Sequence, residues 1–81
     1  MKNNDRLEQK IARLKDGDAR AFDYIYEHTN RYVYFAVFYI LRDKMYAEDI
    51  LQDTFVRAVS SISQYTPGTN FIAWISAIGK S

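Results

Sequence analysis

The chain has no cysteine, and it has only one histidine, one proline and three glycines among its 81 residues. Without cysteine it can form neither a disulfide framework nor a thiolate metal site, which is compatible with a reducing compartment. So few prolines and glycines leave room for few turns and little disorder. The sequence therefore predicts one small domain without crosslinks, near the size at which a single core is barely sufficient.

A long hydrophobic run is also missing. The most apolar stretch, Tyr32 to Leu41, is 10 residues long, which is about half of what a membrane span requires. The opening residues MKNNDRLEQK are polar and lack the apolar centre of a signal peptide. These absences predict an intracellular, cytoplasmic protein with no membrane partner.

Neither sign of charge dominates, since 11 basic and 10 acidic residues give a formal net charge of +1. No overall field therefore favours a polyanionic partner. The charges are interspersed as far as Arg57, but Lys80 is the only charged side chain from Ala58 to Ser81. A solvated surface of that length normally carries more charge. We therefore expect either a covering partner or a natural chain that continues beyond Ser81.

Apolar residues are abundant, at 48% hydrophobic and 16% aromatic, and every clear period along the chain is helical. Leu7, Ile11 and Leu14 predict a short first helix, preceded by a flexible tail over residues 1–5. Gly17 is expected to stop that helix, because glycine readily takes the left-handed conformation of a C-cap.

The second predicted helix begins after Asp18, a plausible N-cap, and runs from Phe22 to Leu41. It is expected to loosen near His28–Arg31, where threonine and asparagine are weak helix formers. A polar connection is predicted for Arg42 to Met45. The apolar run could also suit a strand, but no second strand is available to pair with it.

The third helix is expected over residues 47–62, with a core stripe at Leu51, Phe55, Ala58 and Ile62. Tyr65 to Asn70, YTPGTN, reads as a loop because Pro-Gly is turn chemistry. Thr69 or Asn70 can then cap a fourth helix. Its core positions follow helical spacing at Phe71, Trp74, Ile75 and Ile78. The predicted fold class is all-α, a compact bundle of three to four helices.

Residues for catalysis or metal binding are not grouped. Asp16 and Asp18 flank Gly17, but the other ligands of a calcium loop are missing. Asp49 and Asp53 lie one helical turn apart, with no histidine or third carboxylate to complete a metal site. The sequence predicts no catalytic residue, no metal and no cofactor, and therefore a protein that is not an enzyme.

The third predicted helix has a second face that is mixed in character. Helical spacing brings together Asp49, Gln52, Asp53, Val56 and Ser60. A face that met only water would not be expected to place a valine among its acids. The two open interpretations are a solvated face with an acidic first turn, which suits the helix dipole, and a docking surface.

Three blocks of sequence, GDARAF, AEDILQDTFVRA and PGTNFIAWISAI, occur in an order and spacing that resemble region 2 of sigma-70-family RNA polymerase sigma factors of the extracytoplasmic-function (ECF) group. The matching residues are Gly17, Asp18, Ala21, Phe22, Ala47, Glu48, Asp49, Gln52, Asp53, Phe55, Phe71, Trp74, Ile75 and Ile78.

The resemblance implies a region 2 domain over residues 1–81. It also implies a second, helix-turn-helix domain that reads the upstream promoter element and is absent from this sequence. The family's fourth helix usually continues as Ile-Ala-Arg-Asn and a basic stretch. Here Ile78 is followed by Gly79, Lys80 and Ser81.

The resemblance further implies that the third helix docks on a coiled coil of the polymerase β′ subunit. Its carboxylates and amide could bind basic side chains of that partner, and Val56 would supply a dry centre. The predicted core-binding residues are Asp49, Gln52, Asp53, Val56, Arg57 and Ser60. An anti-sigma protein is a further possible partner.

Promoter DNA is the second implied partner, in the context of the holoenzyme. Aromatic rings can stack on unpaired bases, and a helix start can hold a phosphate. The predicted DNA-binding residues are Tyr65, Thr69, Asn70, Lys80 and Ser81. Phe71 and Trp74 lie on the core stripe and are expected to be structural.

Two functions are carried forward. The first is a transcription initiation module that docks on β′ and helps recognise and open the −10 promoter element. The alternative is a helical protein-interaction adaptor that uses the acidic face alone and has no DNA role.

Overall fold

The computed structural model describes residues 2–41 and 44–81. Over these residues it has four α-helices, α1 (Lys2–Lys15), α2 (Phe22–Leu41), α3 (Lys44–Ser60) and α4 (Phe71–Lys80). Two short 3-10 turns, η1 (Ala19–Ala21) and η2 (Ile62–Gln64), complete the set. The described part of the chain has no strand, so the predicted all-α bundle is confirmed.

The connection between α1 and α2 follows the predicted turn chemistry. Gly17 has a φ of +97°, so it takes the left-handed conformation that ends the helix. The side chain of Asp18 accepts a hydrogen bond from the Arg20 N–H at 3.1 Å. Asp18 therefore caps η1, which leads directly into α2, and the hydrogen bonds from Arg20 lower its pKa. Helix α1 begins at Lys2, so residues 2–5 are helical where a tail was expected.

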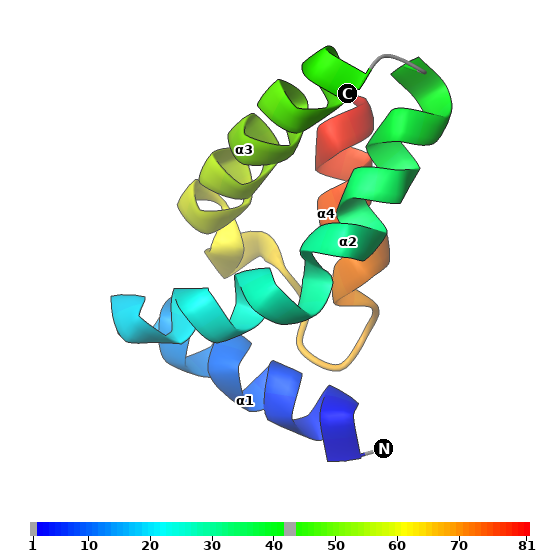
Figure 1. Ribbon diagram of the computed structural model, residues 1–81. Coiled ribbons are helices and arrows are strands. Elements are labelled where there is room, and N and C mark those ends of the chain that lie inside the picture. Colours follow the sequence, from blue (N-terminus) through cyan, green and yellow to red (C-terminus); the bar gives the residue numbers. More distant parts are fainter. Residues whose placement is uncertain (1, 42–43) are drawn as a thin grey trace.

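Helix α2 is continuous but bent, since its first turns lie across α1 and its later turns rise beside α4 (Figure 1). The hydroxyl of buried Thr29 donates to the Ile25 carbonyl at 2.6 Å, and the Asn30 amide donates to the Tyr26 carbonyl at 2.8 Å. Side chains that bond to the carbonyl four residues earlier often bend a helix. The helix thus persists through His28–Arg31, with a physical cause for its bend.

Helix α3 is displaced towards the N-terminus relative to the prediction. Lys44 and Met45, expected in a polar connection, form its first turn, while Arg42 and Asp43 lie outside the described residues. The helix ends at Ser60, and Ile62 lies in η2. All four predicted core positions, from Leu51 to Ile62, are nevertheless buried, because a 3-10 turn still directs Ile62 inward.

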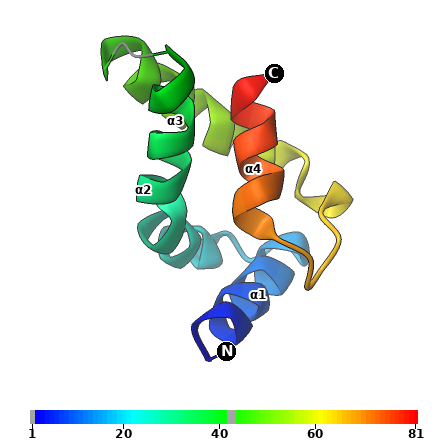
Figure 2. The same cartoon turned by 90° about the vertical axis from the view of Figure 1, so that its right-hand side faces the viewer.

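The core lies where α2, α3 and α4 meet, with α1 closing its lower end (Figures 1 and 2). Burying these apolar side chains supplies the main stabilisation of so small a domain. The buried apolar residues are Ile11, Ala21, Ile25, Val33, Val37, Ala47, Leu51, Phe55, Ala58, Ile62, Tyr65, Phe71 and Ile75. No helix in the described ranges is long and apolar enough to cross a membrane.

Gly79 marks the closest approach of α4 to its neighbours. A Cβ at this position would lie 2.9 Å from the Thr54 Oγ1 and 3.1 Å from a Val37 methyl carbon. Thr54 cannot easily move, since it is buried and its hydroxyl donates to the Ile50 carbonyl. The glycine is therefore required by packing.

We expect Gly79→Ala to lower the free energy of unfolding by about 1–2 kcal/mol, because overpacking outweighs the better helix propensity of alanine. Chemical denaturation monitored by circular dichroism measures the change. Ala77→Gly, at an exposed position of the same helix, is the control for propensity alone. A Gly79→Ala protein as stable as the wild type would show that Thr54 and Val37 can move to make room for the added methyl group.

Candidate functional site

The second face of α3 is exposed. Asp49, Gln52, Asp53 and Ser60 are all exposed, and Val56, in their midst, keeps 65% of its surface accessible. The buried stripe of Leu51, Phe55 and Ala58 occupies the opposite side of the helix. The predicted division of this helix into a core face and an outer face is thus what the structure has.

An open apolar groove of about 650 Å³ lies beside this face. Three of the predicted docking residues, Gln52, Val56 and Ser60, form part of its wall. The lining residues are Leu14, Ala19, Phe22, Tyr26, Gln52, Phe55, Val56, Val59 and Ser60. The groove therefore joins α3 to the end of α1 and the start of α2, and Val56 belongs to a larger apolar surface than α3 alone supplies.

Sequence reasoning missed the contribution of Phe22 and Tyr26 to this groove. Each ring packs edge-on against Phe55, at centroid distances of 6.1 Å and 4.8 Å. The two residues are spaced i, i+4, which predicts that they share a helical face. It does not predict that this face packs on Phe55 and also lines an open groove. Val59 was missed because it lies between the core stripe and the outer face.

Arg57, one of the predicted core-binding residues, also makes contacts within the domain. The half-buried guanidinium donates to the Asp53 carboxylate at 2.9 Å and to the Ile78 carbonyl at 2.9 Å. It also donates to the Ser81 hydroxyl at 3.3 Å, and that hydroxyl donates in turn to the Ile78 carbonyl. Arg57 and Ser81 thus tie α3 to the last turn of α4. Satisfying the carbonyls at that helix end is a sufficient reason for both residues.

Tyr65 is a correction to the predicted DNA-binding set. Its surface is only 1% exposed, and its ring packs against Phe71 and Trp74 at centroid distances of 5.4 Å and 5.5 Å. Its hydroxyl donates to the Glu8 carboxylate at 2.5 Å. A ring enclosed on these sides cannot stack on a base, so Tyr65 is a core residue.

Burial and the hydrogen bond to Glu8 raise the pKa of Tyr65 to about 12, from 10.0 in an unperturbed side chain. Between these values the folded protein keeps a proton that the unfolded chain loses. The stabilisation is complete below pH 10 and is lost as the pH rises towards 12.

We therefore expect stability to fall between pH 10 and pH 12 more steeply in the wild type than in Tyr65→Phe. Urea unfolding at several pH values across this range measures the two slopes. The two proteins differ only in the Tyr65 hydroxyl, so the difference between their slopes reports that group. Equal slopes would show that its hydroxyl does not resist ionisation.

The other predicted DNA-binding residues are exposed but do not form one cluster. The Asn70 side chain accepts from the Ala73 N–H at 3.1 Å and is the N-cap of α4. The Thr69 hydroxyl donates to the Thr66 carbonyl at 2.7 Å. Lys80 lies at the other end of a 10-residue helix, about 15 Å away. Thr69 and Asn70 therefore lie at the start of α4 and Lys80 at its end, and Figure 2 shows that these two ends of the helix are well separated.

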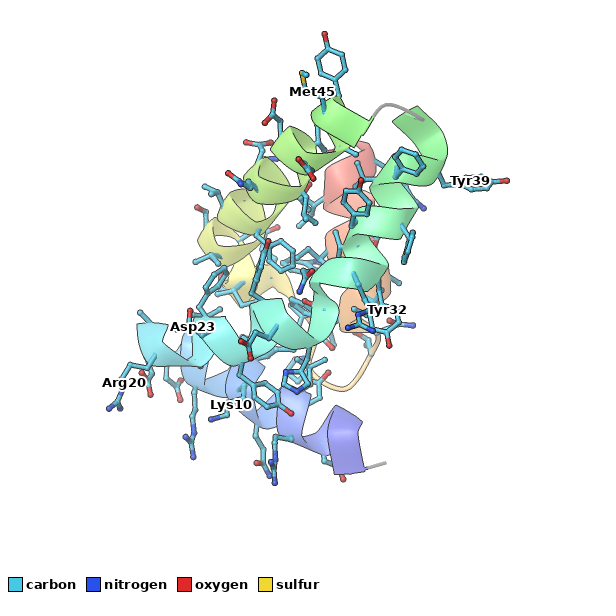
Figure 3. All side chains as sticks on the ribbon, viewed as in Figure 1. Lys10, Arg20, Asp23, Tyr32, Tyr39 and Met45 are labelled. Carbon is cyan, nitrogen blue, oxygen red and sulfur yellow. The ribbon has the colours of Figure 1, made fainter. Side chains whose placement is uncertain are left out.

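A further surface was not predicted, namely a row of exposed aromatic side chains on α2. Tyr32, Phe35 and Tyr39 follow helical spacing and are 57%, 65% and 73% exposed. Figure 3 shows Tyr39 extending outward from the helix. These three side chains belong to the most apolar stretch of the sequence, yet the structure leaves them exposed.

Metal binding finds no support where the structure describes the chain, since no three histidine, cysteine, aspartate or glutamate side chains are grouped there. The described surfaces offer side chains for recognition by hydrogen bonds, charge and apolar contact.

Comparison with known proteins gives one family. The family model Sigma-70 region 2 matches residues 25–81. The chain is 32% identical over 77 residues to the ECF RNA polymerase sigma factor BldN of Streptomyces coelicolor, covering 94% of this chain and 29% of that protein. It is 35% identical over 71 residues to the RNA polymerase sigma factor CarQ of Myxococcus xanthus, covering 88% and 41%. The chain thus spans less than half the length of either relative. No solved structure gives a significant match.

Proposed function

The chain belongs to the sigma-70 region 2 family, and we propose that it acts in transcription initiation. In this proposal it docks on the β′ coiled coil of RNA polymerase and helps to recognise and open the −10 promoter element. It performs no covalent chemistry itself, and it works in the cytoplasm, where the polymerase is.

The observation that carries the docking proposal is the continuity of the exposed α3 face with the apolar groove. Asp49 and Gln52 supply hydrogen-bonding groups around Val56, and the groove extends the apolar surface to Phe22 and Tyr26. An apolar centre with a polar rim is the usual anatomy of a protein interface. A basic, amphipathic helical partner would match this surface in both charge and shape.

The DNA part of the proposal rests on Thr69 and Asn70, which are exposed at the start of α4. The N–H groups of a first helical turn favour an anionic group such as a phosphate. Lys80 adds one positive charge at the far end of the helix. Tyr65 is not part of this surface, and Ser81 takes part in the contact with Arg57.

The experiment that tests the proposal is gel filtration of the chain with core polymerase, with and without the β′ coiled coil. We expect co-elution that depends on the coiled coil, and gain of single-stranded DNA binding by the complex. The adaptor alternative is favoured by the same exposed face and predicts co-elution with no gain of DNA binding. An anti-sigma protein would compete for the α3 face. Failure to co-elute would reject the docking proposal.

A further inference from the structure

We propose that Glu8 of α1 is a positioning residue that fixes the shape of the loop formed by residues 66–70, and through it the presentation of Thr69 and Asn70 to DNA. The inference rests on the proposed DNA role of those two residues. It adds a part of the chain, α1, that lies outside the residues matched by the family model.

The carboxylate of Glu8 contacts the residue that precedes this loop and the residue at its middle. One oxygen accepts the Tyr65 hydroxyl at 2.5 Å, and the other accepts the Gly68 backbone N–H at 3.0 Å. A bidentate acceptor with charge-assisted bonds fixes direction as well as distance. One side chain of α1 therefore sets where the loop leaves the core and where it turns back.

A second residue of α1 reinforces the first. The Lys15 ammonium donates to the Tyr65 carbonyl at 3.1 Å, so both sides of Tyr65 are held from α1. Glu8 and Lys15 are seven positions apart and therefore face the loop from the same side of the helix. Figures 1 and 2 agree that the loop reaches α1 before the chain enters α4.

Besides the Glu8 contacts, the loop is held by the Thr69 side chain, which also interacts with the Tyr65 hydroxyl. All residues from Thr66 to Asn70 are exposed, and within it Thr66 accepts from the Thr69 N–H and hydroxyl at 3.3 Å and 2.7 Å. Gly68 has a φ of +79°, a conformation that glycine takes without penalty and leaves as easily. A loop with such local bonds alone samples many shapes, and ordering it on binding would weaken affinity. Because the Glu8 contacts order the loop before DNA binds, binding does not have to order it.

The test compares Glu8→Ala and Glu8→Gln with the wild type, each bound to core polymerase. The probe is a random pool of single-stranded DNA about 12 nucleotides long, within the usual site size of single-strand binders. Binding selects the sequences that the wild-type complex prefers, and the affinity of each variant for them is measured. Glu27→Gln and Glu27→Ala are matched controls, because Glu27 is an exposed glutamate on α2.

We expect Glu8→Ala to weaken binding of the selected DNA by about fivefold or more and to flatten the base preference. Polymerase affinity should stay within about twofold of the wild type, since Glu8 does not line the groove beside the proposed docking face. The DNA affinity of Glu8→Gln should lie between those of the wild type and Glu8→Ala. Its amide oxygen can still accept from Gly68, while its NH₂ cannot accept from Tyr65. The Glu27 variants should match the wild type.

Amide hydrogen exchange at Gly68 and Thr69 gives an independent reading of the loop. We expect faster exchange in both Glu8 variants, with the core amides of α3 unchanged. If Glu8→Ala unfolds the domain, Glu8→Gln and Tyr65→Phe still separate the effects of the two Glu8 contacts, the one with Tyr65 and the one with Gly68. Tyr65→Phe removes the hydroxyl bond and leaves the bond to Gly68.

Three outcomes would overturn the inference in distinguishable ways. Unchanged DNA affinity and preference in a folded Glu8 variant would show that the loop needs no positioning. An equal loss of polymerase and DNA binding would show that Glu8 acts only on overall stability. A wild-type complex that selects no sequence would reject the proposed DNA role itself, and the inference with it.

Discussion

Phe71→Ala is expected to lower the free energy of unfolding by about 3–5 kcal/mol, the range for truncating a large aromatic residue in a core. Phe71 is 4% exposed and packs against Tyr65 and Trp74, at centroid distances of 5.4 Å and 5.9 Å. Removing its ring leaves a cavity beside two aromatic side chains that cannot collapse into it without leaving their own partners. Urea denaturation, or a thermal melt of the domain, measures the loss.

Trp74→Ala is the informative comparison. Trp74 is only partly buried and packs against the core instead of lying inside it. We therefore expect Trp74→Ala to lower the free energy of unfolding by about 2–3 kcal/mol, which is less than for Phe71→Ala. If Trp74→Ala cost nothing while DNA binding fell, its ring would belong to a base-stacking surface and the core interpretation of this residue would be wrong.

The sequence predicted those parts of the fold that depend on local pattern. The helical spacing of Leu51, Phe55 and Ala58 defines one side of α3 without reference to the rest of the molecule. Gly17 was predicted to end a helix, and Thr69 or Asn70 to cap one, because the conformations at helix ends select few residue types. Of the two cap candidates, the structure has Asn70. The outer face of α3 followed directly, since a side that is not buried must be exposed.

Contacts between distant parts of the chain could not be predicted in this way. Tyr65 precedes a loop, and its local sequence does not reveal Glu8, 57 positions earlier, as the acceptor of its hydroxyl. Arg57 likewise has the spacing of a helix-surface residue, and its second partner, the Ile78 carbonyl, is 21 positions away. Periodicity assigns a side chain to a face, whereas packing of whole helices decides what that face meets.

The apolar groove depends both on local sequence pattern and on contacts between distant parts of the chain. Its α3 wall follows from helical spacing, but its other walls come from α1, η1 and the first turns of α2. The bend in α2 lays those turns across α1, and it depends on side-chain bonds of Thr29 and Asn30. The sequence predicts a loosened stretch at His28–Arg31, but it does not predict the bend that brings these walls together.

Replacing Gln52 with alanine and Val56 with aspartate in one protein is expected to weaken binding to the β′ coiled coil by about 2 kcal/mol or more. Both side chains are exposed, and both line the groove. A carboxylate at the centre of an apolar contact must lose water without gaining a partner. The fold should be almost unaffected, because exposed substitutions usually change stability by about 0.5 kcal/mol or less.

Asp53→Arg tests the same face less cleanly, since it also removes the carboxylate that receives the Arg57 guanidinium. We expect it to weaken binding and, in addition, to lower stability slightly by placing two arginines one turn apart. Ala73→Asp is the matched control for the double variant, because it adds one negative charge at an exposed position of α4. It should leave binding to β′ unchanged.

The decisive measurement pairs titration of each variant against the β′ coiled-coil fragment with a circular dichroism melt. Lost affinity with an unchanged melt assigns the α3 face and groove to the polymerase. If melting and affinity fall together, the face is structural, and the reduced binding follows from unfolding. If the double variant folds and binds as the wild type does, the polymerase must dock elsewhere. The exposed aromatic row of Tyr32, Phe35 and Tyr39 on α2 would then be the next surface to mutate, because aromatic side chains are enriched in the buried centres of interfaces.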